Sequence, residues 1–367
     1  VNQPAAARGN QSVFWNIAYF DKYYFEAIFK GFFFPDGDKP CWESVNVLQK
    51  LFMKWFNKER THEVMTFPVE TFNLLNDGNG DYKDKENAEF CAEMLAEGHS
   101  FFIYQSDSPD ALASCCRLRN ALENNEFSYT LGAGGIETGS KGVITLNLNR
   151  IVQDWKNEGC KVTLKERITE ITERVHKYLS AFNDIVWDYY NNGMLQIYNE
   201  GFINLDKQFL TIGINGFVEG AEFLGYRISP DDENYKQYAI DILTTIKDLN
   251  KRDRQPHCKF NTEFVPAESL GVKNAKWDKQ DGYWVPRDVY NSYFYIVEDT
   301  HTTPLEKFEL MGKDFTGCLD GGSALHMNLD EHLSKAQYEM SRMDATTSHS
   351  TFQTLSAMIV DTFQSKT

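Results

Sequence analysis

Short segments rich in β-branched and aromatic residues alternate with longer segments whose apolar positions recur at helical spacing. This alternation constrains the fold more than any other feature of the sequence. The strand-like segments cover residues 13–20, 63–75, 100–106, 143–148, 209–214, 259–265 and 292–297. The helix-like segments cover residues 43–60, 84–97, 163–192, 216–225 and 232–250. Because strands that alternate with helices usually pair in parallel, the sequence predicts an α/β protein with a parallel sheet, either open or closed into a barrel.

The composition suits a folded protein of this class. Of 367 residues, 42% are hydrophobic and 14% are aromatic, which is enough to bury a large core. No shift in composition marks an internal boundary, so we expect one core domain. The formal net charge is −16, and a surface that negative repels nucleic-acid phosphates. These observations disfavour a DNA- or RNA-binding role but allow a local basic pocket for one nucleotide.

The cysteines and the apolar runs bear on the compartment. The seven cysteines form no dense framework, and an odd number of them is typical of a reducing cytoplasm. No apolar run approaches the roughly 20 residues that a membrane helix needs. The first residues do not resemble a signal peptide. The sequence therefore predicts a cytoplasmic protein that does not enter a membrane.

Two adjacent cysteines, Cys115 and Cys116, follow the predicted strand at residues 100–106. A disulfide between sequence neighbours is strained, so the pair indicates either buried thiols or chemistry. Free cysteine packs well as a small hydrophobe, and on these residues alone burial is the better interpretation. The neighbouring Arg117 favours a thiolate, which is the reactive form. Both interpretations stay open at this point.

Several motifs that could bind a metal or a nucleotide fail on their details. Residues 77–81 resemble the start of a calcium loop, but Tyr82 stands where that loop requires glycine. The glycine-rich stretch at residues 132–142 has Ser-Lys where a phosphate-binding loop has Lys-Ser, and it precedes a strand instead of a helix. The histidines show no metal-ligand spacing, and no Cys-x-x-Cys pair occurs. The sequence therefore predicts no metal site in this chain.

Residues 263–270 place a proline and two acids just after a predicted strand. Ser269 could cap the segment that follows, and the free N–H groups at such a helix start can bind an anion. On these residues alone, an ordinary capped turn is the better interpretation.

These signals occur in one particular order. The ordered segments are residues 10–14 (Asn-Gln-Ser-Val-Phe), 67–71 (Phe-Pro-Val-Glu-Thr), 114–118 (Ser-Cys-Cys-Arg-Leu), 138–151, 212–219 and 266–269 (Pro-Ala-Glu-Ser). Together the series resembles the anaerobic, class III ribonucleoside-triphosphate reductases, which are glycyl-radical enzymes. The resemblance runs from about residue 2 to about residue 338.

The resemblance implies a ten-stranded α/β barrel of the glycyl-radical type, with a finger loop that carries Cys115 and Cys116. The family's loop reads Cys-Arg, which matches Cys116 and Arg117, so Cys116 is the first choice for the thiyl-forming residue and Cys115 the second. The implied chemistry passes from a glycyl radical to the cysteine, which then removes the 3′ hydrogen of the ribose before water leaves from C2′. Formate or a small thiol protein supplies the electrons. Burial inside a barrel suits this chemistry because it excludes water and oxygen.

The resemblance also implies substrate-binding residues. Ser114 lies in the finger loop, and Ser140 lies where other branches of the family carry an asparagine, which leaves its hydrogen bond to the ribose open. A helix N-terminus would hold the substrate phosphate. The residues of that turn are Pro266, Ala267, Glu268 and Ser269.

The implied partners are a ribonucleoside triphosphate as substrate, dNTP or ATP as effectors and a radical-SAM iron–sulfur activase. Family members are dimers, so a second copy of the chain is also expected. The long helix at residues 163–192 is one candidate for that interface, and a helix that only covers the core is at least as good an interpretation.

The sequence departs from the family pattern near both ends. No glycine follows Gly322, so the Arg-x-x-Gly-Tyr type motif that carries the radical is not expected in this chain. The last cysteine is Cys318, so the paired Cys-x-x-Cys motifs of the family's zinc site are also missing. We therefore expect a reductase barrel core at residues 1–338, incomplete at both ends, and a divergent polar tail at residues 339–367.

Three functional hypotheses follow. In the first, the chain is part of an anaerobic reductase and needs a complementing C-terminal segment that carries the glycyl radical. In the second, it is an inactive paralogue or fragment that binds a nucleotide or a partner without turnover. In the third, it belongs to another glycyl-radical branch of the formate-lyase type, which also uses adjacent cysteines. The strand that follows the glycine-rich stretch favours the reductase over the lyase.

Overall fold

The computed structural model describes residues 16–63, 65, 67–78, 81–106, 109, 111–113, 119–121, 139–201, 203–264, 268–299, 301–320, 323–327 and 356–359. The chain divides into two units, which are described separately below. The first unit comprises Val1–Gly135 and His326–Thr367, and the second comprises Ile136–Leu325. Composition does not change between them, which is why no boundary was predicted there. Among the described residues, no helix is both long enough and apolar enough to cross a membrane.

The first unit is built on a mixed sheet. Its strands β1 (Asn16–Phe20), β2 (Val69–Leu75) and β3 (Phe102–Ser106) pair in parallel, and β10 (Ser356–Ile359) adds an antiparallel strand beside β3. The strand order is β1-β2-β3-β10-β9, where β9 is Ala324–Met327. A short antiparallel pair, β4 (Ala111–Ala113) and β5 (Arg119–Ala121), follows β3 in the chain.

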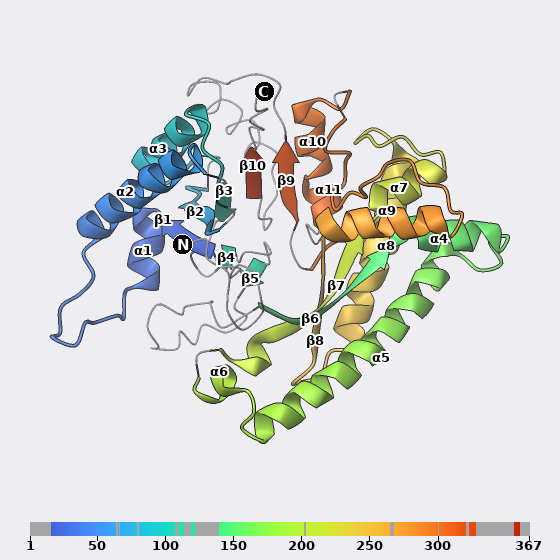
Figure 1. Ribbon diagram of the computed structural model, residues 1–367, viewed down its shortest axis with the longest axis horizontal. Helices are drawn as coiled ribbons and strands as arrows, with labels where there is room; N and C mark the ends of the chain where they lie inside the picture. The colour runs from blue at the N-terminus through green and yellow to red at the C-terminus, as the bar shows by residue number, and fades with distance from the viewer. Residues whose placement is uncertain are drawn as a thin grey trace. The chain divides into compact units, whose positions relative to one another are not determined.

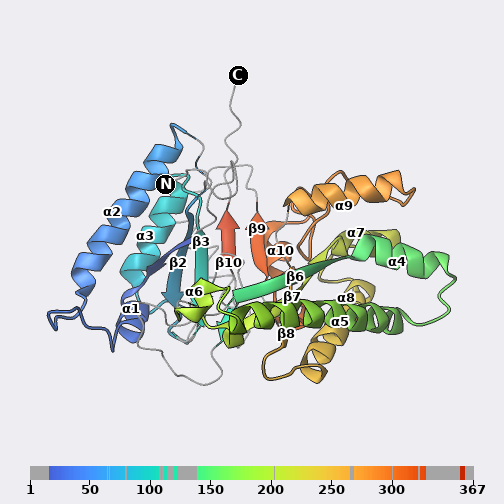
Figure 2. The same cartoon turned by 60° about the horizontal axis from the view of Figure 1, so that its bottom comes forward.

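Helices cover one face of this sheet. Helix α1 (Lys22–Ile28) follows β1, α2 (Trp42–Arg60) precedes β2, and α3 (Lys85–Ala96) precedes β3. Figures 1 and 2 show α2 and α3 side by side along the same side of β1, β2 and β3. Alternate strand residues point to that side, where Phe72 and Leu74 pack with Met53 of α2 and Met94 of α3. The core of this unit therefore lies between the sheet and these two helices.

The second unit contains three parallel strands in the order β6-β7-β8. The strands are β6 (Gly139–Asn147), β7 (Gln208–Asn215) and β8 (Lys259–Glu263). The helices are α4 (Leu148–Asn157), α5 (Leu164–Asn191), α6 (Gln196–Asn199), a 3-10 turn η2 (Leu205–Lys207), α7 (Phe217–Phe223), α8 (Glu233–Arg252), α9 (Glu268–Gln280), α10 (Pro304–Leu310) and α11 (Lys313–Thr316). The parallel pairs confirm the predicted α/β class, and the ten-stranded barrel stays a prediction.

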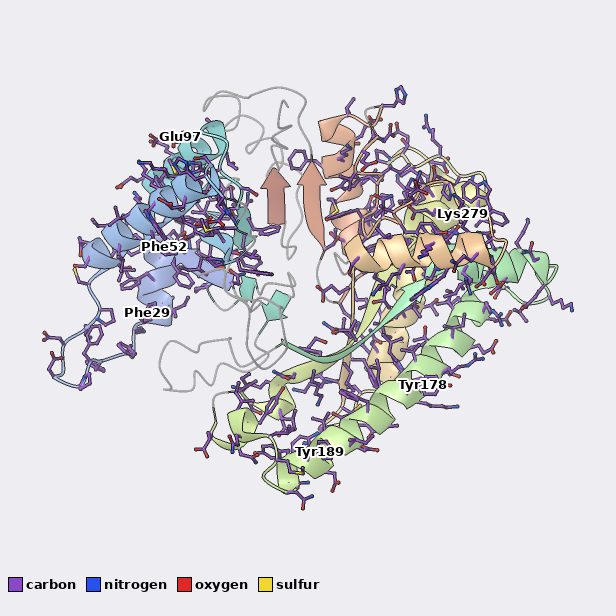
Figure 3. The ribbon with its side chains drawn as sticks, in the orientation of Figure 1. Phe29, Phe52, Glu97, Tyr178, Tyr189 and Lys279 are labelled. Atoms are coloured by element: carbon purple, nitrogen blue, oxygen red, sulfur yellow. The ribbon has the colours of Figure 1, made fainter. Side chains whose placement is uncertain are left out.

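Helix α5 has clear start and stop signals. Thr163 and Glu166 form a capping box, in which the Thr163 hydroxyl accepts from the Glu166 N–H at 3.1 Å and the Glu166 carboxylate accepts from the Thr163 N–H at 2.7 Å. Gly193, with a φ of +69°, ends the helix in a conformation that suits glycine. Figure 3 shows Tyr178 and Tyr189 along this helix, and both side chains are exposed.

The two faces of the second sheet differ in polarity. One face carries the buried side chains of Leu210, Ile212 and Ile214 on β7, with Phe260 on β8. His176 of α5 stacks on Phe260 with ring centroids 4.0 Å apart, so α5 covers this apolar face. The opposite face, called here the polar face, carries the alternate residues of the same strands. Its members are Thr145, Asn147, Thr211, Gly213, Asn215, Asn261 and Glu263, which face one another in the register of the three strands.

One predicted strand is wrong. Residues 292–297 form bends and the start of a turn instead of a strand, although Phe294 and Tyr295 are fully buried. The Tyr235 hydroxyl donates to the Phe294 carbonyl at 2.6 Å, so a side chain takes the place of a strand partner. The aromatic content that suggested a strand therefore serves core packing of an irregular segment.

Candidate functional site

The structure places some of the predicted site residues and leaves others outside the described part of the chain. Ser140 lies near the start of β6, and Ser269 is the second residue of α9. Glu268 begins α9, but its side chain is not described. The remaining predicted residues lie outside the described residues. They are Ser114, Cys115, Cys116, Pro266 and Ala267.

Ser140 belongs to a row of hydrogen-bonded side chains across the three strands. The Thr211 hydroxyl lies 2.8 Å from the Ser140 Oγ and 2.8 Å from the Asn261 Oδ1. The Ser140 hydroxyl also donates to the Gly142 carbonyl at 3.1 Å. Thr211 is fully buried, and Asn261 is 3% exposed. This row, called here the Ser–Thr–Asn row, joins β6, β7 and β8 through their side chains.

An irregularity in β6 directs Ser140 into this row. The register with β7 shifts between Ser140 and Gly142, so one extra residue, Lys141, lies between the two paired positions. Val143 pairs with Thr211. In a regular strand, residues two positions apart share a face, so Lys141 and not Ser140 would lie on the face of Val143 and Thr211. A bulge turns the side chain before it. Ser140 therefore lies beside Thr211, while Lys141 donates to the His257 carbonyl at 3.1 Å.

The polar face continues toward the carboxyl ends of the strands. Gly213 pairs with Glu263, whose side chain is buried. The Asn215 amide donates to the Tyr290 carbonyl at 3.1 Å and to the Ser292 hydroxyl at 3.1 Å. Buried polar side chains on one face of a sheet are uncommon unless they are bonded or bind something. This face is therefore the best candidate for a site in the second unit.

A buried carboxylate, Asp278, organises the carboxyl end of β6. It accepts from the amide of Asn147 at 3.0 Å, from that of Asn149 at 3.2 Å and from Arg150 Nε at 2.7 Å. The Tyr290 hydroxyl donates to the same carboxylate at 2.8 Å. Burial, followed by the hydrogen bond to Asp278, raises the pKa of Tyr290. Because Asp278 lies on α9, these bonds fix α9 against the end of β6.

The first turn of α9 is also fixed. Gly271 lies so close to the segment after α9 that a Cβ atom there would be 2.6 Å from the Tyr290 carbonyl oxygen. Asn274 in the next turn donates to the Asn215 Oδ1 at 2.7 Å, which ties α9 to the end of β7. Ligands of parallel sheets bind near the carboxyl ends of the strands. The N-terminus of α9 is therefore fixed near the carboxyl ends of the strands, and Ser269 is exposed there.

A second buried carboxylate, Glu70, lies in the first unit on the helix-covered face. It accepts from the Tyr19 hydroxyl at 2.5 Å, from the Asn57 amide at 3.2 Å and from Arg60 at 3.2 Å. Burial raises the pKa of Glu70 to about 7, against the opposing effects of these three donors. Its bonds join β1, α2 and β2, so Glu70 is part of the core of the first unit.

A cavity of about 720 Å³ lies on the helix side of the second unit. Its lining includes His176, whose Nδ1 is 2.8 Å from the Asp253 Oδ2 and whose Nε2 is 2.9 Å from the Asn250 Oδ1. These bonds tie α5 to α8. Acidic and basic side chains both line the cavity, and none of the predicted site residues does. It therefore points to no particular ligand.

No cluster of three or more potential metal-ligating side chains occurs within the residues that the structure describes. The sequence itself has no Cys-x-x-Cys pair. The cysteines of this chain therefore do not fit a structural zinc site of that type.

Sequence reasoning pointed to Ser140 and to the residues at the start of α9, but not to Thr211, Asn261 or Asp278. A signal for the first two was present. Polar residues alternate with apolar ones at the end of β7, and polar residues dominate β8, which indicates strands with a polar face even where both faces are buried. Asp278 had no such signal, because its partners are 12 to 131 residues away in sequence.

Comparison with known families gives one result. The chain matches the family described as anaerobic ribonucleoside-triphosphate reductase over residues 1–358. No protein with a curated description matches the chain.

Solved structures give a consistent picture. A structure of the anaerobic ribonucleotide reductase from Thermotoga maritima with MES in the active site is 28% identical, with a TM-score of 0.80, and the match covers 97% of this chain and 59% of that chain. A structure of the Thermotoga maritima enzyme in complex with dATP and CTP matches at 28% identity and a TM-score of 0.79, over 97% of this chain and 58% of that chain. Another anaerobic ribonucleotide reductase matches at 27% identity and a TM-score of 0.79, over 95% of this chain and 55% of that chain. The chain thus spans between 55% and 59% of the length of these three.

Proposed function

The chain belongs to the anaerobic ribonucleoside-triphosphate reductase family, and we propose that it supplies the substrate-binding and thiyl-forming part of a reductase that converts ribonucleoside triphosphates to deoxyribonucleotides. The observation that carries the proposal is the family match, together with the hydrogen bond that joins the predicted residue Ser140 to Thr211 of the polar face. The ten-stranded barrel is part of the proposal, supported by the parallel pairing of β1, β2 and β3 and of β6, β7 and β8 and by the similarity to solved reductases.

Cys116 is the proposed hydrogen-abstracting thiol, with Cys115 as the second choice. The motif order supports this assignment, because the pair follows β3 and precedes the glycine-rich stretch and β6. Ser114 is proposed to contact the substrate beside the thiol. Exclusion of water and oxygen would protect a thiyl radical from side reactions, so a buried position of the thiol is part of the proposal.

The phosphate end of the substrate is proposed to bind at the N-terminus of α9. The proposed phosphate-binding residues are Pro266, Ala267, Glu268 and Ser269, of which Glu268 and Ser269 begin α9. Helix N–H groups that have no partner inside the helix bind phosphate. Asp278 and Gly271 hold this helix against β6 and Tyr290. The Thermotoga maritima structure with dATP and CTP supports a ribonucleoside triphosphate as substrate and a deoxynucleotide as effector for this chain as well.

We propose that the glycyl radical resides on a segment outside this sequence and that a separate activase generates it there. No glycine follows Gly322, so the residues here do not fit the radical site, and no step is assigned to them through that group. When present, the radical would supply the initial abstraction of hydrogen from the cysteine. Formate or a thiol protein is the proposed reductant.

A homodimer is proposed for the working protein. Helix α5 has a row of exposed apolar side chains at Tyr178, Phe182, Ile185 and Tyr189, which a monomer in water would leave unpacked. The spacing of these residues puts them on one face of the helix. This face supports a contact with another chain or segment.

The test is reconstitution under strict anaerobiosis with a radical-SAM activase. The chain alone is expected to show no ribonucleotide reduction, and addition of a C-terminal segment with the glycyl-radical motif is expected to restore it. Cys116→Ser should abolish the restored activity, whereas Cys160→Ser, a change at an exposed cysteine, should not. Failure to restore any turnover would favour the inactive paralogue. Normal turnover in Cys116→Ser with loss in Cys115→Ser would move the thiyl to Cys115.

A further inference from the structure

We propose that His176 and Asp320 share one proton through the side-chain amide of Asn250, and that this proton makes the packing of α5 and β8 on α8 depend on pH. The three side chains come from α5, from the segment after α11 and from α8, and all three lie in the second unit. They are called here the His–Asn–Asp network. The inference goes beyond the proposed function and does not depend on it, because the network lies on the helix-covered face of the sheet, where His176 stacks on Phe260.

One side of the His176 ring has a fixed hydrogen-bond role. Its Nδ1 lies 2.8 Å from the Asp253 Oδ2, and Arg252 donates to both oxygens of that carboxylate, at 2.7 and 2.9 Å. The hydrogen bond from Arg252 lowers the pKa of Asp253, so this carboxylate is ionised and can only accept. The Nδ1 of His176 therefore carries a proton.

The protonation of the other ring nitrogen depends on the orientation of the Asn250 amide. The amide oxygen lies 2.9 Å from the His176 Nε2, and the amide nitrogen lies 2.8 Å from the Thr262 Oγ1 and 3.0 Å from the Asp320 Oδ2. In this orientation Nε2 must donate to the oxygen, so the ring carries a second proton and is an imidazolium. The amide N–H groups then donate to Thr262 and to an ionised Asp320.

The opposite orientation of the amide moves the proton to Asp320 and keeps every bond. The amide of Asn250 then donates to the Nε2 of a neutral His176, and its oxygen accepts from the Thr262 hydroxyl and from a protonated Asp320. Desolvation raises the pKa of Asp320, which favours its protonated form. Both orientations therefore hold one proton more than a neutral histidine together with an ionised aspartate.

Loss of the shared proton leaves two acceptors in contact, whichever way the amide turns. The amide oxygen then faces either the unprotonated Nε2 of His176 or the ionised carboxylate of Asp320. Water cannot replace the lost donor easily, because His176 is 4% exposed, Asn250 is 2% exposed and Thr262 is fully buried. The folded chain therefore keeps the shared proton at a pH at which an unfolded chain has lost it.

The charged groups around His176 balance one another. Three acidic and three basic side chains line the same cavity as His176, namely Glu173, Lys177 and Asp184 of α5 and Arg252, Asp253 and Arg254 at the end of α8. Arg252 pairs with Glu173 at 2.9 Å as well as with Asp253. Next to Asp320, the charge of Lys247 opposes the effect of desolvation on the pKa. The pattern of hydrogen bonds, and not an excess of one charge, therefore decides whether the proton stays.

The shared proton affects the positions of three elements. The Asp320 carboxylate also accepts from the Thr262 N–H at 2.5 Å, which ties the segment after α11 to β8. Lys247 of α8 donates to the Gly317 carbonyl at 2.6 Å, so α8 holds the same segment at a second point. When the proton leaves, either the contact of α5 with α8 or the contact of Asp320 with α8 loses its hydrogen bond.

The experiment measures urea unfolding of the full chain between pH 6 and pH 9, with Asp320→Asn as the main variant. The new amide can accept from the Thr262 N–H and donate to the Asn250 oxygen, so it replaces a protonated aspartate and needs no shared proton. An unfolded histidine loses its proton near pH 6.5, so the contribution of the shared proton to stability is complete below about pH 6.5 and is lost as the pH rises. Between pH 7 and pH 8.5 the equilibrium constant of unfolding should rise about tenfold more in the unaltered chain than in Asp320→Asn.

Two further variants and one spectrum separate proton sharing from a simple ion pair. His176→Gln removes the titrating ring and should lose the same pH-dependent rise. Asp314→Asn changes an exposed carboxylate of α11 and should keep the profile of the unaltered chain. In Asp320→Asn labelled with ¹⁵N-histidine, the ring of His176 should be neutral at pH 7.5 with its proton on Nδ1, a signature that a purely structural role of Asp320 would not produce.

The outcomes decide between these roles. Parallel pH profiles for the unaltered chain and Asp320→Asn would overturn the shared proton, and so would a full pH-dependent rise in His176→Gln. An equal loss of stability in Asp320→Asn at every pH would make Asp320 an ordinary ion-pair partner. If His176→Gln does not fold, the comparison with Asp320→Asn decides alone. None of these results bears on ribonucleotide reduction, which reconstitution tests separately.

Discussion

Two buried carboxylates, Glu70 in the first unit and Asp278 in the second, have the same kinds of partners but different positions relative to their sheets. Each accepts hydrogen bonds from a tyrosine, from asparagine and from an arginine. Glu70 lies between its sheet and the helices that cover it. Asp278 lies on α9 and bonds to the residues at the carboxyl end of β6. The kinds of partner therefore do not show which carboxylate serves a site. The position of the carboxylate relative to the sheet does show it.

The difference teaches where a buried charge can affect function. A group between a sheet and its helices can change the stability of the fold without a large effect on the other face. A group at the carboxyl end of a parallel strand fixes the segment that ligands of such sheets contact. We therefore expect substitutions of Asp278 to change both stability and nucleotide binding, and substitutions of Glu70 to change stability alone.

The largest effect is expected for Asp278→Asn. All four partners of Asp278 are donors, and an amide has only one acceptor oxygen and brings two new donors. The free energy of unfolding should fall by about 3–5 kcal/mol, as for other buried ion pairs that lose one partner. CTP affinity should fall by at least about tenfold, because α9 loses its link to β6. Urea unfolding and calorimetry measure the two quantities.

The control for this prediction is Asp281→Asn. Asp281 is an exposed residue that bonds to the same Arg150, at 2.6 Å. Exposed ion pairs contribute about 0–1 kcal/mol. Equal losses in Asp278→Asn and Asp281→Asn would contradict the assignment of Asp278 as the anchor of α9.

The second prediction concerns the pH dependence that Glu70 gives to the first unit. Burial raises the pKa of Glu70 to about 7 in the folded chain, from an ordinary value of 4.5. The folded state therefore holds the proton more tightly than the unfolded state, so this contribution to stability is complete below about pH 4.5 and is lost as the pH rises through 7. The loss between pH 4.5 and pH 8 should be about 3 kcal/mol.

Glu70→Gln should remove that part of the pH dependence and leave CTP affinity unchanged. A smaller slope of the same sign should persist, because burial also raises the pKa of Asp21 to about 6. Glu89→Gln, at an exposed carboxylate of α3, should leave the wild-type profile intact. The midpoint of urea unfolding across this pH range is the measurement, and an unchanged profile in Glu70→Gln would show that Glu70 stays ionised in the fold.

Much of the fold could be predicted from the sequence because the periodicity was strong. The helix predicted at 163–192 is Leu164–Asn191, and the strand predicted at 209–214 is Gln208–Asn215. Only the start of helix α9 was predicted, because polar residues dominate the rest of the helix. Its position depends on Asp278 and Asn274, whose partners are distant in sequence.

The candidate site could be predicted only where family motifs marked it. The order of motifs predicted Ser140 as a site residue but did not indicate its neighbours Thr211 and Asn261. Thr211 is 71 residues from Ser140 and 50 from Asn261 in sequence, and their contact depends on the register of three strands and on a bulge in β6. Local periodicity shows which residues share a face of one strand, but not which strands pair or where a bulge falls. The predicted cysteines lie outside the described residues, so their roles stay predictions.

The smallest effect is expected for Gly271→Ala, which tests the comparison without removing a charge. The new Cβ would lie 2.6 Å from the Tyr290 carbonyl oxygen, so the first turn of α9 must shift. Overpacking of this kind costs about 1–3 kcal/mol of the free energy of unfolding.

Gly312→Ala brings a Cβ to 2.8 Å from the Glu309 carbonyl oxygen, next to α10, and should cost a similar amount. Only Gly271→Ala should also weaken CTP binding, because only it moves the N-terminus of α9. Equal CTP affinity in the two variants would mean that this N-terminus does not hold the phosphate.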